Sequence, residues 1–317
     1  MLNVLKLKAN NRIMNNLVIE THNLSKYYGK DRGIIDINLN IEKGEIFGFI
    51  GPNGAGKSTT IRTLLGLIFP SSGHGKIFGL DIINQAKEIK KKIGYMPAEV
   101  NYYHKMDVRE LLSYSARFYE TDCTLRIKKL AEIFALDLER KILDLSRGNQ
   151  KKVSILQSLI HQPRLLILDE PTSGLDPLMQ AKFFEILKEE NSRGTTIFFS
   201  SHTLSEVQKM CRRVAIIKDG SIVAVEDIES LRKKQLRKIQ VEFDHTIKTE
   251  EIDCHGIIAP QIENSTLKFM FSNHISALLT SLEGKGIKDL IIEEPTLEEI
   301  FMHYYSDNQE ADQKETG

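Results

Sequence analysis

Through most of residues 17–228, short apolar runs alternate with amphipathic stretches. Residues 46–50 and 165–168 are apolar runs of strand length, which is typical of central strands that are covered on both faces. Residues 196–200 form a third run, with Ile-Phe-Phe at its centre. Strands that are separated by helices predict an α/β fold with a mainly parallel sheet.

The strand pattern is absent between about residues 97 and 160. Five residues there recur at helical spacing: Leu111, Leu112, Ser115, Phe118 and Tyr119. A linker would lack such periodic positions. We therefore predict a mostly helical subdomain, inserted into the sheet domain.

A charged helix predicted over residues 229–238 leads into a smaller unit. Three segments of this unit have the pattern of strands: 239–243, 267–271 and 288–292. Residues 274–282 predict a helix, and Thr296 with Glu299 forms a capping box that predicts the start of a last helix. The pattern indicates a small C-terminal α+β domain over residues 229–305.

Residues 1–16 and 306–317 differ in composition from the rest of the chain. The first segment has three basic residues and no acid, and it lacks the apolar core and cleavage site of a signal peptide. We expect it to be disordered or to precede a true start at Met14; contact of its basic residues with a membrane surface is the alternative. The last segment has four acids, one lysine and no large apolar residue, which predicts a disordered tail.

Charge and cysteine content narrow the function classes. The 317 residues include 43 Lys+Arg and 43 Asp+Glu, so the chain lacks the basic excess of a dedicated nucleic-acid binder, and we expect no nucleic-acid partner. The longest stretch without a charged residue, 269–282, is shorter than the ~18 residues that span a bilayer. Cys123, Cys211 and Cys254 are too few and too far apart for a disulfide framework or a paired metal motif, which indicates a reducing cytoplasm.

A glycine-rich segment follows the strand at 46–50 and precedes a predicted amphipathic helix. It matches the phosphate-binding loop, and we assign nucleotide binding to these positions: Gly51, Pro52, Asn53, Gly54, Ala55, Gly56, Lys57, Ser58 and the adjoining Thr59. Glycines let backbone N–H groups point at phosphates, Lys57 reaches the outer phosphates, and the Ser58 hydroxyl ligates Mg²⁺. The strand-loop-helix context disfavours the alternative, an ordinary glycine-rich turn.

Two carboxylates, Asp169 and Glu170, follow the apolar run at 165–168. They are expected at the carboxyl end of a buried strand, which is the edge where ligands bind in open α/β sheets. Asp169 is suited to hold Mg²⁺, and Glu170 to orient or deprotonate the attacking water. A solvated pair at a strand end is the alternative, which the phosphate-binding loop in the same chain disfavours.

Residues 18–224 resemble the nucleotide-binding subunits of ATP-binding cassette transporters. Residues 145–149, Leu-Ser-Arg-Gly-Asn, stand where that family carries its signature sequence, Leu-Ser-Gly-Gly-Gln. Ser146 and Gly148 fit the signature, whereas the third and fifth positions depart from it. The resemblance implies that this helix start grips a γ-phosphate; a merely N-capped helix is the alternative.

Three further positions follow from the same resemblance. Residues 173–176 resemble the family's D-loop, which implies that Asp176 lies near nucleotide. His202 falls on the switch histidine, where a neutral imidazole can hydrogen-bond to the γ-phosphate or to the attacking water. Tyr28 matches the aromatic residue that stacks on adenine, with Tyr27 as the competing candidate.

One position departs from the family pattern in a way that affects the chemistry. Ala98 stands where the family usually has a glutamine, which contacts Mg²⁺ or water and links the site to the helical subdomain. A methyl group can do neither. Either the neighbouring Glu99 substitutes for it, or hydrolysis is slower.

The resemblance also implies cofactors and partners. Because each motif is present once, two cassettes would meet head to tail with two ATP molecules and Mg²⁺ between them, as a homodimer or a heterodimer. They would drive a separate membrane permease from the cytoplasmic face of the membrane. The C-terminal extension with its run at 295–301 resembles that of exporters for drugs, antimicrobial peptides or lipids. A soluble cassette ATPase acting on ribosomes or nucleic acid is the alternative.

The resemblance places the permease contact at residues 99–107. Tyr102, Tyr103 and Met106 stand there among polar residues, and aromatic side chains and methionine are common at the centres of interfaces. A loop packed against its own core is the alternative.

Overall fold

The computed structural model describes residues 16–100, 102, 105–119, 121–233, 237–247 and 254–293. The chain divides into two compact units, with the boundary between Glu226 and Asp227. The predictions for residues 1–15, for the capping box of Thr296 and Glu299, and for the tail from residue 306 lie outside the described residues.

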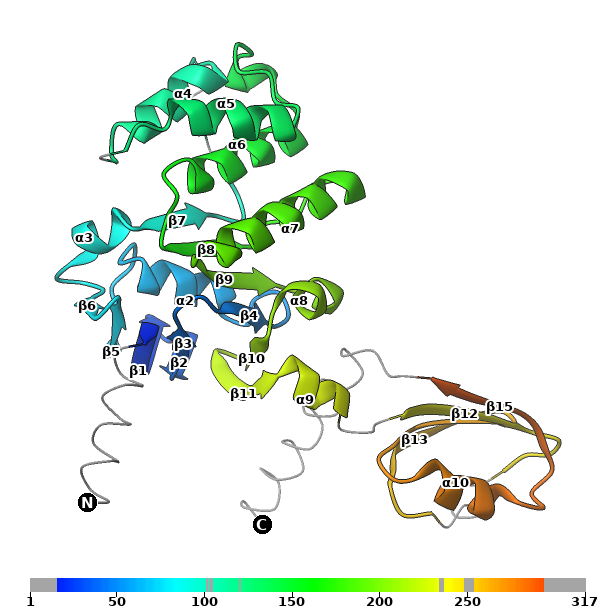
Figure 1. Cartoon of the computed structure of the whole chain (residues 1–317). Coiled ribbons are helices and arrows are strands. Elements are labelled where there is room, and N and C mark those ends of the chain that lie inside the picture. The colour runs from blue at the N-terminus through cyan, green and yellow to red at the C-terminus, as the bar shows by residue number, and fades with distance from the viewer. Residues whose placement is uncertain are drawn as a thin grey trace, which may run out of the picture. The chain divides into compact units, whose positions relative to one another are not determined.

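A six-stranded sheet forms the centre of the first unit (Figure 1). In spatial order, its strands are β11 (Ser221–Asp227), β10 (Arg213–Lys218), β4 (Ile46–Ile50), β9 (Thr196–Ser201), β8 (Leu165–Asp169) and β7 (Ile93–Met96). The four pairs from β10 to β7 are parallel, so the carboxyl ends of these strands lie at one edge. β8 is buried at every position, which explains its continuous apolar run.

The mainly parallel sheet predicted from the sequence is accompanied by a second sheet. Its five strands are β1 (Leu17–Tyr28), β2 (Asp31–Ile37), β3 (Asn40–Glu42), β5 (Ser72–Ile77) and β6 (Leu80–Asp81). All of its pairs are antiparallel. β1 and β2 are joined by only two residues, a connection that can link only antiparallel strands, and Gly29 supplies the positive φ of 63° that this turn uses.

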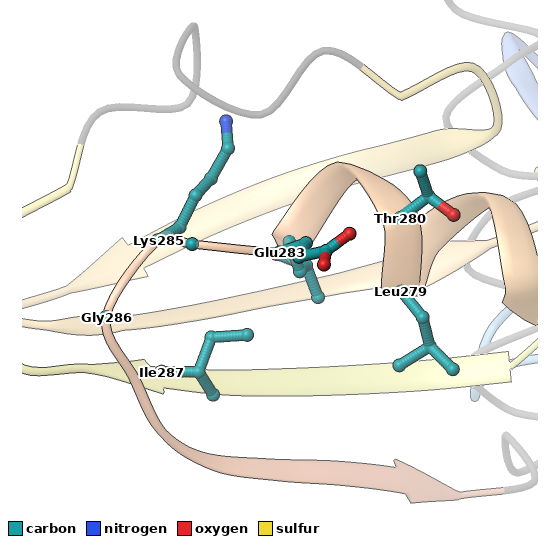
Figure 2. A pocket seen from close by; sticks show the side chains of 8 residues that line it. Leu279, Thr280, Glu283, Lys285, Gly286 and Ile287 are labelled. Atoms are coloured by element: carbon teal, nitrogen blue, oxygen red, sulfur yellow. The ribbon is translucent and has the colours of Figure 1, made fainter.

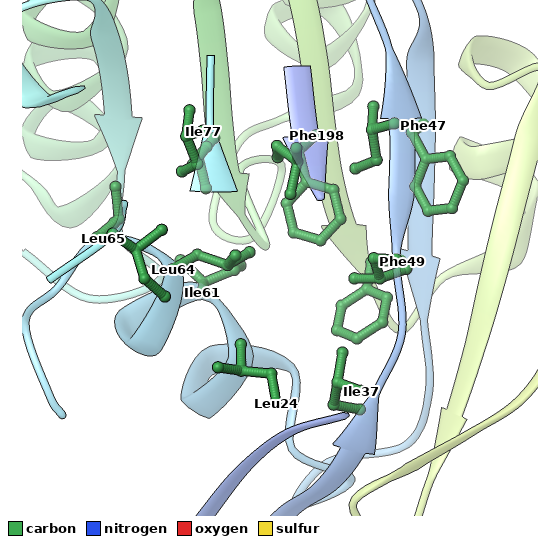
Figure 3. Packing of buried hydrophobic residues seen from close by; sticks show 14 of the residues in the cluster. Leu24, Ile37, Phe47, Phe49, Ile61, Leu64, Leu65, Ile77 and Phe198 are labelled. Carbon is green, nitrogen blue, oxygen red and sulfur yellow. The ribbon is translucent and has the colours of Figure 1, made fainter. Parts of the chain in front are cut away.

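The main hydrophobic core of this unit includes residues of both sheets and of helix α2 (Lys57–Leu64). Figure 3 shows Ile61 and Leu64 of α2 near Leu24 of the antiparallel sheet and Phe198 of the parallel sheet. These four side chains are fully buried, and each contributes about 1.5–3 kcal/mol to the free energy of unfolding. The core therefore packs α2 against both sheets.

Among the described residues between β7 and β8, only helices and loops occur. The helices that follow β6 in this unit are α3 (Ala86–Lys90), α4 (Val108–Ala116), α5 (Thr124–Ile133), the short 3₁₀-helix η1 (Ile142–Asp144), α6 (Arg147–Leu159), α7 (Pro177–Ser192) and α8 (Leu204–Met210). Figure 1 shows α4, α5 and α6 gathered together beyond β7. α4 begins with a capping box in which Asp107 accepts from the backbone of Glu110 and the Glu110 side chain accepts from the backbone of Asp107.

The second unit contains helix α9 (Ile228–Lys233) and an antiparallel sheet with one helix. The sheet order is β13 (Ile257–Glu263), β14 (Thr266–Phe271), β12 (Arg237–Phe243) and β15 (Ile287–Glu293), and α10 (Ile275–Leu282) precedes β15. β13 was not predicted from the sequence. Its polar–apolar alternation is broken by Pro260 and by a register shift beside Ala259, whose φ is 47°.

A shallow hollow of about 390 Å³ lies at the end of α10, between Leu279 and the start of β15 at Ile287 (Figure 2). Glu283 and Lys285 are its only ionisable side chains among the described residues. We assign no chemistry to it. In the described part of the chain, no helix combines the length and the apolar character needed to cross a membrane.

Candidate active site

The loop of residues 51–56 joins β4 to α2, and its conformation depends on glycine. Gly54 has a φ of 80° and Gly56 a φ of 109°, which glycine adopts at little cost. A Cβ atom on Gly51 would lie 2.3 Å from the carbonyl oxygen of Ile217, so no larger residue fits there. The glycines of the predicted phosphate-binding loop are therefore required by the local geometry.

Lys57 is the first residue of α2 and turns its ammonium group back over this loop. Its Nζ donates to the carbonyl oxygens of Gly51 at 2.7 Å and Pro52 at 3.1 Å. The same Nζ lies 3.4 Å from Oε1 of Glu170, and the Lys57 side chain is only 5% exposed. A buried cation surrounded by oxygen atoms is suited to bind phosphate oxygens in their place.

Asp169 and Glu170 lie at the carboxyl end of β8, as predicted. Both are hydrogen-bonded to Ser200 of the neighbouring strand β9. The hydroxyl of Ser200 donates to Oδ1 of Asp169 at 2.7 Å. The backbone N–H of Glu170 donates to both the carbonyl and the hydroxyl oxygen of Ser200, each at 3.2 Å. Glu170 has a φ of 45°, a conformation that costs a non-glycine residue about 1–3 kcal/mol and persists only where the surrounding contacts hold it.

His202 follows β9 and completes a chain of contacts around Glu170. Its Nδ1 lies 3.2 Å from Oε2 of Glu170, while Oε1 of the same carboxylate faces Lys57. The His202 side chain is 50% exposed, so its ring is open to solvent. The fold thus brings Lys57, Glu170 and His202 together from three separate parts of the sequence.

A hollow of about 250 Å³ lies over the phosphate-binding loop. The predicted residues that line it are Tyr28, Asn53, Gly54, Gly56, Lys57, Ser58, Thr59 and Glu170. Tyr28, and not Tyr27, is among them. The donors fit a nucleotide with Mg²⁺, because hard cations prefer oxygen ligands: Ser58, which carries a hydroxyl, lines the hollow, and Asp169, which carries a carboxylate, is the last residue of β8, directly before Glu170.

Ser146, Gly148 and Asp176 do not line this hollow. Five further predicted residues are also outside its lining, but each adjoins or contacts a residue of it: Gly51, Pro52, Ala55, Asp169 and His202. The Ser146 hydroxyl caps α6 by accepting from the backbone of Asn149, and the Asp176 carboxylate caps α7 in the same way. A Cβ atom on Gly148 would lie 3.3 Å from the carbonyl oxygen of Gly174, so the two helix starts are neighbours. The structure therefore separates these three predicted residues from the hollow of their own chain.

Four residues of the site were not identified from the sequence, and one of them, Gly33, lines the hollow next to Arg32 in the chain. Arg32 lines the hollow and pairs with Asp219, Ser200 holds Asp169, and Lys151 of α6 donates to the backbone of Glu170. A signal existed for Ser200, which is a buried polar residue directly after the apolar run of residues 197–199. Arg32 and Lys151 belong to no motif, and only the fold shows their contacts.

Ala98 lies directly after Pro97 and accepts a hydrogen bond at its carbonyl oxygen from Nζ of Lys151, at 2.9 Å. Its methyl group can neither donate nor accept a hydrogen bond. The neighbouring Glu99 is exposed.

Ala98→Gln is expected to leave the rate of ATP hydrolysis by the isolated chain equal or to raise it, because it adds a donor and an acceptor beside the site. Steady-state phosphate release measures this. A large fall in rate would mean that the site is organised around Glu99, and Glu99→Gln would then lower the rate of the unsubstituted chain as well.

Comparison with known proteins identifies the family. Residues 34–173 match the family described as ABC transporter. The chain is 38% identical over 232 residues to the bacitracin transport ATP-binding protein BcrA of Bacillus licheniformis, an alignment that covers 71% of this chain and 75% of that protein. It is 30% identical over 295 residues to the Nod factor export ATP-binding protein I of Cupriavidus metallidurans, which covers 90% of this chain and 96% of that protein.

Solved structures share the fold of the first unit. The ATP-binding subunit of an ABC transporter is 29% identical with a TM-score of 0.65, covering 68% of this chain and 92% of that chain. A dimeric ATP-binding cassette in a post-hydrolysis state, bound to ADP and phosphate, is 25% identical with a TM-score of 0.61, covering 66% of this chain and 98% of that chain.

The predicted fold class is confirmed: the chain is an α/β phosphate-loop ATPase of the cassette type. It belongs to the ATP-binding proteins of ABC transporters. The chain is therefore an ATP-hydrolysing subunit of a transporter, and the transport function is favoured over action on ribosomes or nucleic acid. ATPases of this family dimerise as cassettes and work with membrane permease subunits.

Proposed function

We propose that this chain binds ATP in the hollow over the phosphate-binding loop and hydrolyses it with Glu170 as general base. The observation that carries this proposal is the convergence of Lys57, Glu170 and His202 beside that hollow. One oxygen of the Glu170 carboxylate faces a cation that is suited to bind phosphate, and the other faces the histidine.

Each residue has a separate task in this proposal. The N–H groups of the loop and the ammonium group of Lys57 bind the outer phosphates, and Tyr28 stacks on the base. Mg²⁺, held by Ser58 and Asp169, would neutralise the negative charge that develops on the phosphates. Glu170 takes the proton of the attacking water, and His202 orients that water or contacts the γ-phosphate.

A second cassette completes each site in this proposal. Ser146, Gly148 and Asp176 stand at the starts of two helices away from the hollow of their own chain, and helix starts attract phosphate. The similar cassette that was solved as a dimer with ADP and phosphate supports this arrangement. Two identical chains are the simplest pair, because one chain carries every motif once.

A groove of about 950 Å³ is the proposed binding site for the permease. Aromatic and aliphatic side chains line most of it, and two of them, Tyr114 and Phe118, are 43% and 63% exposed. Lys87 and Lys90 add positive charge to the lining. The groove therefore suits a short helix of the permease with an apolar face and acidic residues beside it.

This groove extends the contact predicted at residues 99–107, because it includes Val100 and Tyr102. The Tyr102 hydroxyl donates to the backbone carbonyl of Gln150 at 3.2 Å, so its side chain also packs against its own domain. Tyr103 lies outside the described residues. Tyr114 and Phe118 are thus better probes of the interface than the tyrosine pair.

The proposed cargo is a drug, peptide or lipid, and the proposed direction is export. Two relatives support this, one named for bacitracin transport and the other for Nod factor export. The second aligns with 90% of this chain and therefore includes most of the C-terminal unit. The chain would be held at the cytoplasmic face of the membrane by its permease.

Tyr114→Ala combined with Phe118→Ala is expected to reduce capture of the permease at least about tenfold, because two aromatic anchors of an interface are removed. ATP affinity should be unchanged. Tagged full-length chain is purified from solubilised membranes, and the permease is identified by mass spectrometry as a polytopic membrane protein.

Phe69→Ala is the matched control, since Phe69 is 69% exposed but does not line the groove. Equal capture by the control, the double variant and the unsubstituted chain would reject the groove as the permease site. Absence of any permease in all three samples would count against the transporter partnership itself.

A further inference from the structure

Lys151 is a buried cation in the second turn of α6, and the proposed chemistry does not use it. The residue is only 6% exposed. Its Nζ donates to the carbonyl oxygens of Ala98 at 2.9 Å, Glu170 at 3.2 Å and Pro97 at 3.5 Å. One ammonium group thus joins three elements: α6, the segment after β7 and the end of β8.

Burying this cation is costly. Lysine is rarely buried without a partner, and burial lowers the pKa of Lys151, while the nearby carboxylates of Asp169 and Glu170 act in the opposite direction. A neutral side chain could bind backbone carbonyls without the cost of desolvating a charge. A role in the proposed active site therefore explains the buried ammonium group of Lys151 better than a role in packing does.

The contact acts on the one strained residue among the proposed catalytic groups. Glu170 has a φ of 45°, and its N–H is held by Ser200 of β9. Its carbonyl oxygen accepts from Lys151 and from the N–H of Ser173. Without Lys151, the backbone of Glu170 keeps its hydrogen bonds to β9 and to Ser173 but loses its only described hydrogen bond to α6.

The position of Lys151 on α6 gives the contact a second consequence. The same helix is capped by Ser146, in the segment proposed to bind the nucleotide of the opposite cassette. A movement of the helix start is transmitted along a rigid helix to Lys151. The movement then reaches the backbone of Glu170 and of Ala98. Ala98 stands where the family usually has the glutamine that links the site to the helical subdomain.

We propose that Lys151 is a positioning residue for ATP hydrolysis, which ties the backbone of Glu170 and of the Pro97–Ala98 segment to α6. The proposal rests on the proposed role of Glu170 as general base. When the opposite cassette binds the start of α6, these hydrogen bonds pass the movement of α6 to Glu170. The Glu170 carboxylate is thereby aligned with the attacking water. Lys151 itself touches neither water nor phosphate.

Lys151→Met removes the donors and keeps the length of the side chain. We expect kcat for ATP hydrolysis to fall at least about 10-fold, because small misplacements of a catalytic group cost up to 10²-fold. The KM for ATP should stay within about twofold, since phosphate-binding groups are unaffected. Lys151→Gln, which keeps two N–H donors without the charge, should recover a substantial part of kcat.

The decisive measurement compares Lys151→Met in two backgrounds, the unsubstituted chain and the Glu170→Gln variant. Single-turnover rates of ATP hydrolysis are measured in both. If Lys151 acts through Glu170, Lys151→Met should change the residual rate of the Glu170→Gln variant by no more than about twofold. Equal losses in both backgrounds would overturn the proposal, because a general loss of structure would be independent of Glu170. A kcat that is unchanged in the Glu170 background would overturn it as well.

Lys152→Met is the matched control, a neighbouring lysine on the same helix, and it should leave kcat unchanged. If Lys151→Met does not fold, Lys151→Ala, which also removes the donors, is compared in the two backgrounds: a fall confined to the Glu170 background supports the proposal, and no fall or equal falls overturn it. Failure of the base assignment is distinguishable, since Glu170→Gln alone would then retain its rate.

Discussion

Glu170→Gln should slow ATP hydrolysis by about 10²–10⁴-fold, the usual contribution of a general base. The amide keeps the shape of the carboxylate but cannot accept the proton of the attacking water. ATP should bind as tightly as before or more tightly, because Oε1 of Glu170 lies 3.4 Å from Nζ of Lys57 and the loss of its charge frees that ammonium group for phosphate.

Slow turnover should also trap the closed pair of cassettes. Analytical ultracentrifugation with ATP and Mg²⁺ should show a stable dimer of the Glu170→Gln variant and a weaker one of the unsubstituted chain. A variant that stays monomeric at high concentration contradicts the two-cassette site, and a rate within a few-fold of the unsubstituted chain contradicts the base assignment. Glu132→Gln is the control, because Glu132 is an exposed residue of α5, and it should alter neither the dimerisation nor the rate of ATP hydrolysis.

Lys57→Ala should weaken ATP binding at least about 100-fold, because charge-assisted hydrogen bonds contribute about 1.5–3 kcal/mol each and Lys57 can make more than one to the phosphates. Nζ already lies among three oxygen atoms, those of Gly51, Pro52 and Glu170, so the site is arranged around a cation at this point. Isothermal titration calorimetry with ATP and Mg²⁺ measures the loss.

Two controls accompany the measurement of ATP affinity. Lys43→Ala changes an exposed lysine of the same unit and should leave ATP affinity unchanged. Circular dichroism should show that the Lys57→Ala variant is folded, because the buried core beneath α2 does not include the Lys57 side chain. Unchanged affinity in a folded variant would reject the assignment of the hollow as the nucleotide site.

Local motifs predicted much of this site. The phosphate-binding loop could be recognised because its glycines are required by backbone geometry within the loop itself, as Gly54 and Gly56 show. Asp169 and Glu170 could be placed because an apolar strand ends directly before them. The meeting of Glu170 with Lys57 and His202 follows from parallel strands whose carboxyl ends share one edge.

Residues whose function depends on distant partners could not be found in this way. Lys151 and Arg32 belong to no pattern, and Ser200 is only a polar residue in a buried strand until its contact with Asp169 is seen. β13 was missed because Pro260 and a register shift interrupt its alternation. Tyr102 stays a prediction for the interface: it lines the groove, and its hydroxyl also donates to the backbone carbonyl of Gln150.

The sequence by itself therefore determined the fold class, the phosphate-binding loop and the two strand-end carboxylates, because these depend on short-range patterns of apolar, glycine and charged residues. The tertiary structure decided which side chains act together. It paired the two oxygens of Glu170 with different partners, joined Lys151 to the backbone of two loops, and separated Ser146 from the hollow of its own chain. Contacts between residues far apart in the chain depend on how sheets and helices pack, which no local pattern records.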